Sequence, residues 1–520
     1  MLNRYITAIA VAAMTVIIAV SQPDAAGRRL PKDQIAKDAE ITNAYANTHC
    51  NVLGIADHPS ELVFDSLDWK IPLGDSYRTQ LPTSGHVAYV AVDSSLPLIS
   101  IEAHIRSGSI GDPAGQVGLG SLMARLLRAG GTEAYPADTL DMLIDLLAMR
   151  FSFSQGEAHI VFQASFLYEY ADTAMSIMQQ MFFHPAFEEE KIERERSIMK
   201  EAIRHRFANP GPTLSVAYRK HNYPETPVSR LATAASLDSI SRDDFVNLHR
   251  AAFGSSEMII SASGKFDRDE MIARLDAVFP AQESRREVPI PEIEIVPQVR
   301  ALIIHRDINQ AYIRMGLPLF RRPHDDFYAV SIMNFILGGS GFISRLGTRV
   351  RSDEGLTYSI HSSAESNYTY PGTLFVNFHT KTESYPKAIS IILEEMEKII
   401  NEGVTESELE NARSALISEL PSMFRSPEDI VSTYAWSEFY GRAPDHYVRY
   451  PEELMKLTLD DIKAAARKYI DFGRISYTIV GDTAAISRAN AAATGDGFFV
   501  LDSLETKKFT VADSLVGMWQ

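Results

Sequence analysis

Arg351 and Tyr358 are two residues whose side-chain types could do chemistry on a carbonyl group. They lie seven positions apart in the segment Val350–Ile360. A guanidinium and a phenol both donate hydrogen bonds, and together they could bind a peptide carbonyl and stabilise an oxyanion developing on it. In isolation, Arg351 would be read as a surface ion pair with Asp353 or Glu354, and Tyr358 as a half-buried strand residue.

A second segment, residues 117–132, has the pattern of a buried helix with one unusual face. Gly130 and Gly131 supply a left-handed stop. The opposite face carries Ser121, Ala124 and Arg125, where inverted zinc peptidases carry H-x-x-E-H. The apolar stripe consists of Leu119, Leu122, Met123, Leu126 and Leu127.

Metal-binding motifs are missing from the sequence. The chain has 14 histidines and one cysteine, Cys50, yet it contains no H-x-x-E-H, H-E-x-x-H or H-x-H. We therefore expect no metal in this chain. His104 falls in an expected strand, where a lone histidine is more often structural than a ligand. His184, His205, His221 and His249 are scattered, and we expect them to be surface or core residues.

Composition excludes one class of partner. The chain has 520 residues, of which 45% are hydrophobic, and a formal net charge of −17. This length suits two or more globular domains. The acidic balance argues against nucleic acid, because phosphate binding needs clustered Lys and Arg.

Residues 1–26 have the pattern of a secretory signal. Arg4 lies in a short basic region, an uncharged apolar run follows from Ile6 to Val20, and Ala19-Val20-Ser21 is a plausible cleavage site. An exported chain without disulfides fits a periplasmic protein. The alternative is an uncleaved segment that keeps the protein membrane-associated, although the run is short for a span.

The rest of the chain divides into two similar halves. Residues 27–80 form an N-terminal extension, 281–300 a proline-rich charged linker, and 490–520 a C-terminal tail, so that the halves are 81–280 and 301–489. Phe162–Ile177 parallels Phe375–Ile391, an internal duplication with a period of about 215 residues. The predicted strands are 87–92, 98–105, a hairpin over 151–166, 257–264, 301–304, 310–317, 370–379 and 476–480. The predicted helices, besides 117–132, are 137–148, 171–183, 188–206, 236–252, 325–337, 386–400, 406–419 and 459–470.

The segment Gly108–Thr132 resembles peptidase family M16, which includes pitrilysin, insulin-degrading enzyme and mitochondrial processing peptidase. Its Gly108-Ser109, Asp112-Pro113 and Gly115 match the family's G-S-x-x-(D/E)-P-x-G, followed by the glycine-closed helix. The resemblance extends over about residues 80–490. It implies an α+β fold of two homologous domains, each an antiparallel sheet flanked by helices (M16 metallopeptidase-like, LuxS/MPP-like). It also implies a chamber that holds peptides.

Within this resemblance, the positions that carry the family's zinc chemistry are replaced. Ser121 and Arg125 stand at the two histidine ligands, Ala124 at the glutamate base, and Ala202 at the third ligand. Glu195 matches a supporting carboxylate seven residues before Ala202. Arg125 would put a fixed positive charge where the metal belongs. Glu201 lies one position from the ligand site, about 100° around the helix.

The second half keeps a different family signature. The segment Leu337–Ile360 is similar to L-G-G-x-x-x-S-R-L-(x)4-R-(x)3-G-L-x-Y-S, in which Arg351 and Tyr358 match the pair that binds substrate backbone in active members. The resemblance therefore implies a non-catalytic subunit that would supply Arg351 and Tyr358 to a zinc-bearing M16 homologue acting on peptides. Two alternatives stay open: a peptide-binding or scaffold protein without a role in proteolysis, and an active zinc peptidase using Glu201 or nearby histidines.

Overall fold

The computed structural model describes residues 69–254, 257–279, 281, 291–297, 299–493, 501 and 506–510. The predicted signal, most of the extension and much of the linker lie outside the described residues. The described residues from Ile71 onward belong to one compact unit. Among the described residues, no helix combines the length and the apolar character needed to cross a membrane.

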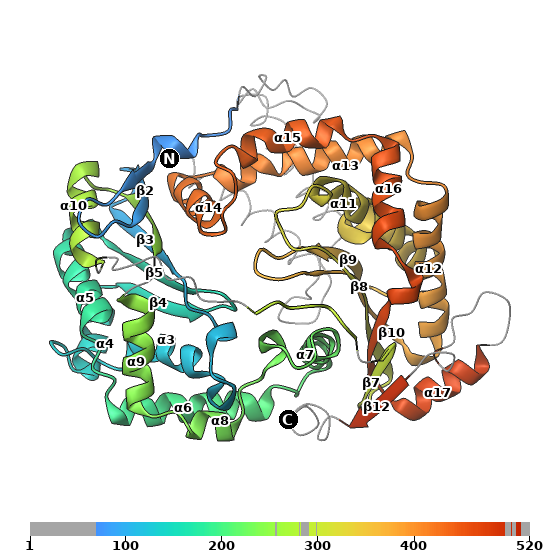
Figure 1. Ribbon diagram of the computed structural model, residues 1–520, viewed down its shortest axis with the longest axis horizontal. Helices are drawn as coiled ribbons and strands as arrows, with labels where there is room; N and C mark the ends of the chain where they lie inside the picture. The colour runs from blue at the N-terminus through green and yellow to red at the C-terminus, as the bar shows by residue number, and fades with distance from the viewer. Residues whose placement is uncertain are drawn as a thin grey trace, which may run out of the picture. The chain divides into compact units, whose positions relative to one another are not determined.

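Two six-stranded sheets organise the fold (Figure 1), and five strands of each share one topology. The sixth strands differ, since β1 pairs antiparallel with β2 and β12 pairs parallel with β7. The first has the order β1-β2-β6-β3-β5-β4 and the second the order β12-β7-β11-β8-β10-β9. In each sheet one pair inside the repeat is parallel, β2 with β6 and β7 with β11, and the other repeat strands pair antiparallel. The predicted α+β fold with duplicated sheets flanked by helices is confirmed, with these parallel pairs added.

The first half of the chain, residues 78–278, supplies the first sheet and a set of helices. The strands are β1 (Arg78–Gln80), β2 (Val87–Val92), β3 (Leu98–Ile105), β4 (Arg150–Gln155), β5 (Ile160–Leu167) and β6 (Met258–Gly264). The helices are α3 (Leu119–Ala129), α4 (Ala137–Leu146), α5 (Ala171–Phe183), α6 (Glu189–His205), α7 (Pro210–Asn222), α8 (Ala234–Asp238), α9 (Arg242–Phe253) and α10 (Arg268–Val278).

The second half of the chain, residues 301–510, supplies the second sheet and a set of helices. The strands are β7 (Ala301–His305), β8 (Gln310–Pro318), β9 (Ile360–Glu365), β10 (Thr373–Lys381), β11 (Ser476–Gly481) and β12 (Thr506–Thr510). The helices are α11 (Phe327–Asn334), α12 (Tyr385–Asn401), α13 (Glu406–Ser418), α14 (Pro427–Phe439), α15 (His446–Lys456), α16 (Leu459–Tyr469) and α17 (Thr483–Ala492).

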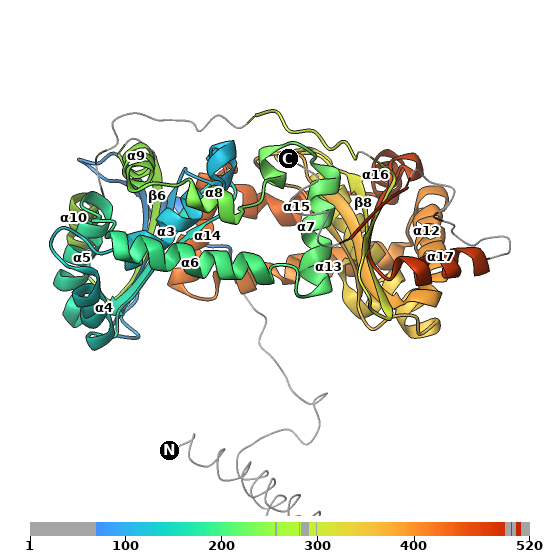
Figure 2. The same cartoon turned by 90° about the horizontal axis from the view of Figure 1, so that it is seen from below.

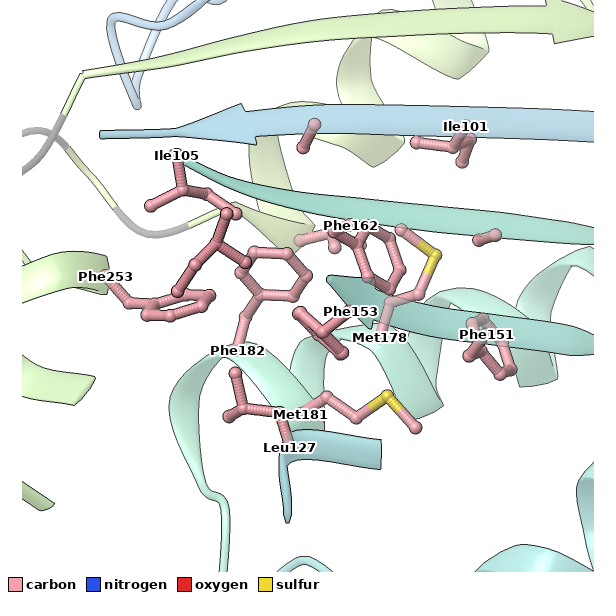
Figure 3. Close-up of a cluster of buried hydrophobic side chains, with 14 of the residues drawn as sticks. Ile101, Ile105, Leu127, Phe151, Phe153, Phe162, Met178, Met181, Phe182 and Phe253 are labelled. Atoms are coloured by element: carbon pink, nitrogen blue, oxygen red, sulfur yellow. The ribbon is translucent and has the colours of Figure 1, made fainter. Parts of the chain in front are cut away.

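A hydrophobic core fills the space between the first sheet and its helices (Figure 3). Phe162 of β5 stacks edge-on against Phe182 of α5, with ring centroids 5.1 Å apart. Leu127 of α3 lies in the same cluster, so the apolar stripe predicted for this helix is its buried face. Because strand side chains alternate between faces, the other face of the sheet is left for a different partner.

That partner comes from the opposite half. α14 packs on β6, β2 and β3 of the first sheet, while α7 packs on β11, β8 and β7 of the second (Figures 1 and 2). His221 of α7 is buried and bonds through its ring nitrogens to Thr478 Oγ1 (2.9 Å) and Val299 O (2.7 Å). In α14, the Glu438 carboxylate accepts bonds from Arg78 (2.7 Å) and Tyr89 (2.6 Å). Each half therefore covers the other half's sheet.

Several elements differ from the sequence predictions. The single helix expected over 236–252 is two helices, α8 and α9, because Ser241 and Asp244 form a capping box that starts α9 anew. Predicted helix 325–337 ends as α-helix at Asn334 and continues as π-helix to Gly339. The sequence predictions contained none of β1, β9, β12, α7, α10, α14, α15 and α17. The extension and the tail, for which no role was predicted, supply β1 and β12 as edge strands.

Candidate functional site

α3 is fixed at its N-terminus by Asp112. The Asp112 carboxylate accepts hydrogen bonds from the backbone N–H groups of Gly118 (2.9 Å) and Gly120 (3.2 Å). Gly118 has φ +104°, a conformation that favours glycine. A Cβ on Gly120 would lie 1.8 Å from the Gln155 side chain, so the helix approaches β4 closely at this turn. Sequence analysis found the glycines but assigned Asp112 no part in holding the helix.

Ser121 and Ala124 offer neither an imidazole nor a carboxylate, the groups that hold catalytic zinc and activate its water. The half-buried Ser121 hydroxyl donates to Gln155 Oε1 at 2.6 Å. Ala124 is 2% exposed and packs in the core. A methyl group therefore occupies the place where the family resemblance implies a general base.

Arg125 forms an ion pair across the two helices. Its guanidinium lies 3.6 Å from the carboxylate of Glu195 on α6, and the two side chains are 50% and 12% exposed. The cation thus binds the residue that the family resemblance implies as a supporting carboxylate. This arrangement disfavours a divalent cation at the same place by charge repulsion.

The third ligand position and its neighbour offer no substitute. Ala202 is exposed on α6. Glu201 bonds to residues of its own helix, Arg204 at 2.6 Å and His205 at 2.9 Å. Arg204, and after it His205, lower the pKa of the Glu201 carboxyl. No group of three or more His, Cys, Asp or Glu side chains in the described part of the chain could hold a metal. The residues present do not fit zinc.

The singled-out histidines have structural contacts. His104 is fully buried, with Nε2 3.0 Å from Glu102 and its ring 4.2 Å from that of Trp436. His249 stacks on Phe253 at 4.8 Å. His184 lies 3.4 Å from Glu133, a residue of the loop after α3.

Arg351 lies in a π-helical turn and stacks on an exposed ring. Arg351 belongs to the π-helix η9 (Gly347–Asp353). Its guanidinium carbon lies 3.7 Å from the ring centroid of Phe342, which precedes that helix. Phe342 and Ile343 are 65% and 75% exposed. The predicted alternative, an ion pair of Arg351 with Asp353 or Glu354, does not occur among the described residues: Asp353 pairs with Arg349, and Glu354 with Lys387.

Tyr358 points into solvent from a constrained segment. Its residue exposure is 87%, and β9 begins two positions later, so the alternative of a half-buried strand residue is wrong. The Thr357 hydroxyl, beside it, bonds to His379 O at 2.6 Å and Ser359 O at 3.0 Å. No hydrogen bond or cation–π contact joins Arg351 to Tyr358 within the described residues. Sequence reasoning did not include Phe342 and Ile343, although two large apolar residues after three glycines were a signal.

Comparison with known proteins places this geometry in a family. The family model described as "Insulinase (Peptidase family M16)" matches residues 90–230, and that described as "Peptidase M16 inactive domain" matches residues 239–416. The two matches together cover more than half of the chain. The chain belongs to peptidase family M16. Ser121, Ala124, Arg125 and Ala202 stand where the family resemblance places the zinc ligands and the base, as suits a non-catalytic M16 member.

Individual relatives agree with the family assignment, and their names include both a non-peptidase and a zinc protease. The chain is 22% identical over 392 residues to the "Non-peptidase homolog YmxG" of Helicobacter pylori, covering 74% of this chain and 90% of the relative. It is also 22% identical over 409 residues to an "Uncharacterized zinc protease" of Mycobacterium leprae, covering 76% and 89%. The crystal structure of a peptidase M16 inactive domain from Pseudomonas fluorescens superposes with a TM-score of 0.70 at 21% identity, covering 78% and 97%.

Proposed function

We propose that this M16 protein is the substrate-binding, non-catalytic subunit of a two-subunit zinc peptidase. Its partner would be an M16 homologue that carries H-x-x-E-H and the zinc. The observation that carries the proposal is the contrast between two sites. At the expected zinc site, Arg125 forms an ion pair with Glu195. At the second site, Arg351 and Tyr358 are accessible and have no carboxylate partner among the described residues.

The segment around Arg351 suits peptide binding. A guanidinium without a carboxylate partner keeps its hydrogen-bond donors for a peptide carbonyl. Stacking on Phe342 restricts its rotamers without using those donors. Phe342 and Ile343 also expose apolar area that a substrate side chain could cover. In this proposal Tyr358 supplies a second donor.

We further propose that the subunit works in the periplasm after export through residues 1–26. This part of the proposal rests on the basic n-region, the apolar run and the small-residue cleavage site alone. The partner and the peptide substrate would then be exported as well.

The test is reconstitution with a zinc-bearing M16 homologue from the same organism, followed by hydrolysis of a quenched fluorescent peptide. The chain alone should cleave nothing, and adding it should raise the partner's rate. Arg351→Ala should abolish that gain, and Tyr358→Phe should reduce it about 10²- to 10³-fold, the usual effect of losing an oxyanion donor. Arg425→Ala, which removes an arginine with a 74% exposed side chain, is the matched control.

Two outcomes would overturn the proposal. If Arg351→Ala and Tyr358→Phe stimulate as well as the unaltered chain, the protein is a scaffold without a role in proteolysis. If the isolated chain contains stoichiometric zinc and cleaves the peptide in a chelator-sensitive way, it is a peptidase with non-standard ligands.

A further inference from the structure

A cavity of about 440 Å³ lies where the turn between β4 and β5 meets the turn between β9 and β10. Tyr440 and Arg442, just after α14, close it together with Arg322, which follows β8. The cavity has the size of a small-ligand site. Arg351 and Tyr358 are not among the residues that line it, so it is a separate feature of the molecule.

Two arginines converge on one wall of this cavity. The guanidinium carbons of Arg322 and Arg442 lie 4.5 Å and 5.0 Å from the ring centroid of Tyr368. Arg442 donates from Nε to Tyr368 Oη and from Nη1 to Tyr447 Oη, both at 2.8 Å. Within the described part of the chain, neither guanidinium forms an ion pair with a carboxylate. Two partly buried like charges are therefore held together without an anion.

Arg322 is the less satisfied of the two. Its guanidinium is stacked 3.8 Å from the Phe327 ring centroid, and no described side chain accepts a hydrogen bond from it. Burial lowers the pKa of Arg322, and repulsion from Arg442 acts in the same direction. An anion bound at this wall would relieve the repulsion and accept charge-assisted hydrogen bonds.

Stacked aromatic rings make the adjoining wall rigid. Tyr368 stacks on Tyr440 with centroids 5.2 Å apart, and Tyr440 stacks on Trp436 at 5.5 Å. Tyr223 and Tyr370 form a second, edge-on pair at 5.4 Å. Such walls bind apolar or planar groups at little conformational cost, since the rings are already ordered.

The acidic residues of the cavity limit the charge of an anion that fits. Glu157 is already engaged, since it lies 3.0 Å from Arg219 and accepts a bond from the Tyr370 hydroxyl. Glu365 lines the same cavity and forms no ion pair with a described residue. A phosphate ester, with a charge near −2, would be repelled by Glu365 more than a singly charged carboxylate. Glu365 would instead favour a ligand that also carries an amino group.

We propose that this cavity binds the free carboxyl end of a short peptide. The carboxylate would lie against Arg322 and Arg442, and the terminal side chain against Tyr368 and Tyr440. Recognition would come from guanidinium–carboxylate hydrogen bonds at one wall and from ring contacts at the other. The site is independent of the Arg351 site, so the two proposals stand or fall separately.

Calorimetric titration of the purified chain with Gly-Phe, Gly-Leu and Gly-Ser, each compared with its C-terminal amide, tests this proposal. At least one dipeptide should bind, and its amide should bind at least tenfold more weakly because the charge-assisted bonds are lost. Arg322→Gln should weaken binding of the acid at least tenfold. Arg321→Gln, which removes the adjacent exposed arginine, should leave it unchanged.

Three results would overturn the proposal. The first is no binding of any dipeptide at millimolar concentration by a chain whose unfolding transition is normal. The second is equal affinity for acid and amide, or for the unaltered chain and Arg322→Gln. The third is inorganic phosphate displacing the dipeptide at a lower concentration than the dipeptide itself requires, which would identify a phosphate site.

Discussion

The Arg125 guanidinium lies 3.6 Å from the Glu195 carboxylate, on the facing sides of α3 and α6. In a zinc-binding M16 protein, position 125 would carry an imidazole and Glu195 would stand behind the metal site. Here the two residues neutralise each other. α3 packs on α6, and this ion pair joins the two helices.

The purified chain is expected to contain no stoichiometric zinc. Three ligands and an open position are needed for a catalytic zinc, and Ser121, Arg125 and Ala202 provide none of the three. The triple variant Ser121→His/Arg125→His/Ala202→Glu is expected to gain zinc, because the altered residues lie at the family's ligand positions on α3 and α6. Elemental analysis after dialysis measures the zinc content of the unaltered chain and of the triple variant. Equal zinc in the two chains would contradict the expectation.

Arg125→Glu should destabilise the fold by about 1 kcal/mol, because it places two carboxylates side by side. Arg125→Ala should cost only about 0.5 kcal/mol, since the arginine is 50% exposed and solvent screens the pair. Urea denaturation gives both values. The double variant Arg125→Glu/Glu195→Arg should recover most of the loss, and an absence of recovery would show that the pair is not an energetic unit.

Gly316→Ala should destabilise the contact between α7 and the second sheet by about 2 kcal/mol. A Cβ at Gly316 would lie 2.0 Å from the hydroxyl of Tyr218, whose side chain is buried against Phe375. Gly115→Ala is the control, because nothing lies within 4 Å of the Cβ it would add. Thermal unfolding should show a lower midpoint for Gly316→Ala alone. Equal midpoints would mean that Tyr218 moves aside freely.

Stability should fall as the pH drops from about 6.5 to about 4, in part because of His221. Burial lowers the pKa of His221 to about 4, against about 6.5 for an exposed histidine. In this interval the unfolded chain binds a proton that the folded chain does not, so the free energy of unfolding decreases with falling pH. A pKa shift of this size lowers the free energy of unfolding by up to about 3 kcal/mol near pH 4. Well above pH 6.5 it has no effect on that free energy.

His221→Gln should reduce this pH dependence, although it should also cost stability at pH 7 by disturbing the bonds to Thr478 and Val299. The measurement is the urea midpoint at pH 7 and pH 5 for both chains. His205→Gln, which changes a histidine with a 71% exposed side chain, should keep the dependence of the unaltered chain. If His221→Gln keeps it as well, other buried histidines carry the effect.

The sequence by itself determined many of the local elements and the residue types at the positions where the family carries its zinc ligands. Strands β2 and β3 occupy the predicted ranges 87–92 and 98–105, because alternation at period two is a local property. α5 likewise spans the predicted 171–183. The replaced ligand positions were legible because a metal ligand must be a particular residue type at a particular spacing.

Only the tertiary structure showed how the halves are joined. α7 begins with Pro-Gly-Pro, a turn signal in sequence, yet proline is well tolerated in the first turn of a helix. α14 and α7 are stabilised by sheets of the opposite half. Contacts with distant parts of the chain produce no hydrophobic periodicity that sequence analysis could detect. Three-residue β1 is too short for any pattern. Arg125 and Glu195 are 70 positions apart in the sequence, and packing brings them together. Arg322 and Arg442, which both contact Tyr368, are 120 positions apart and meet for the same reason.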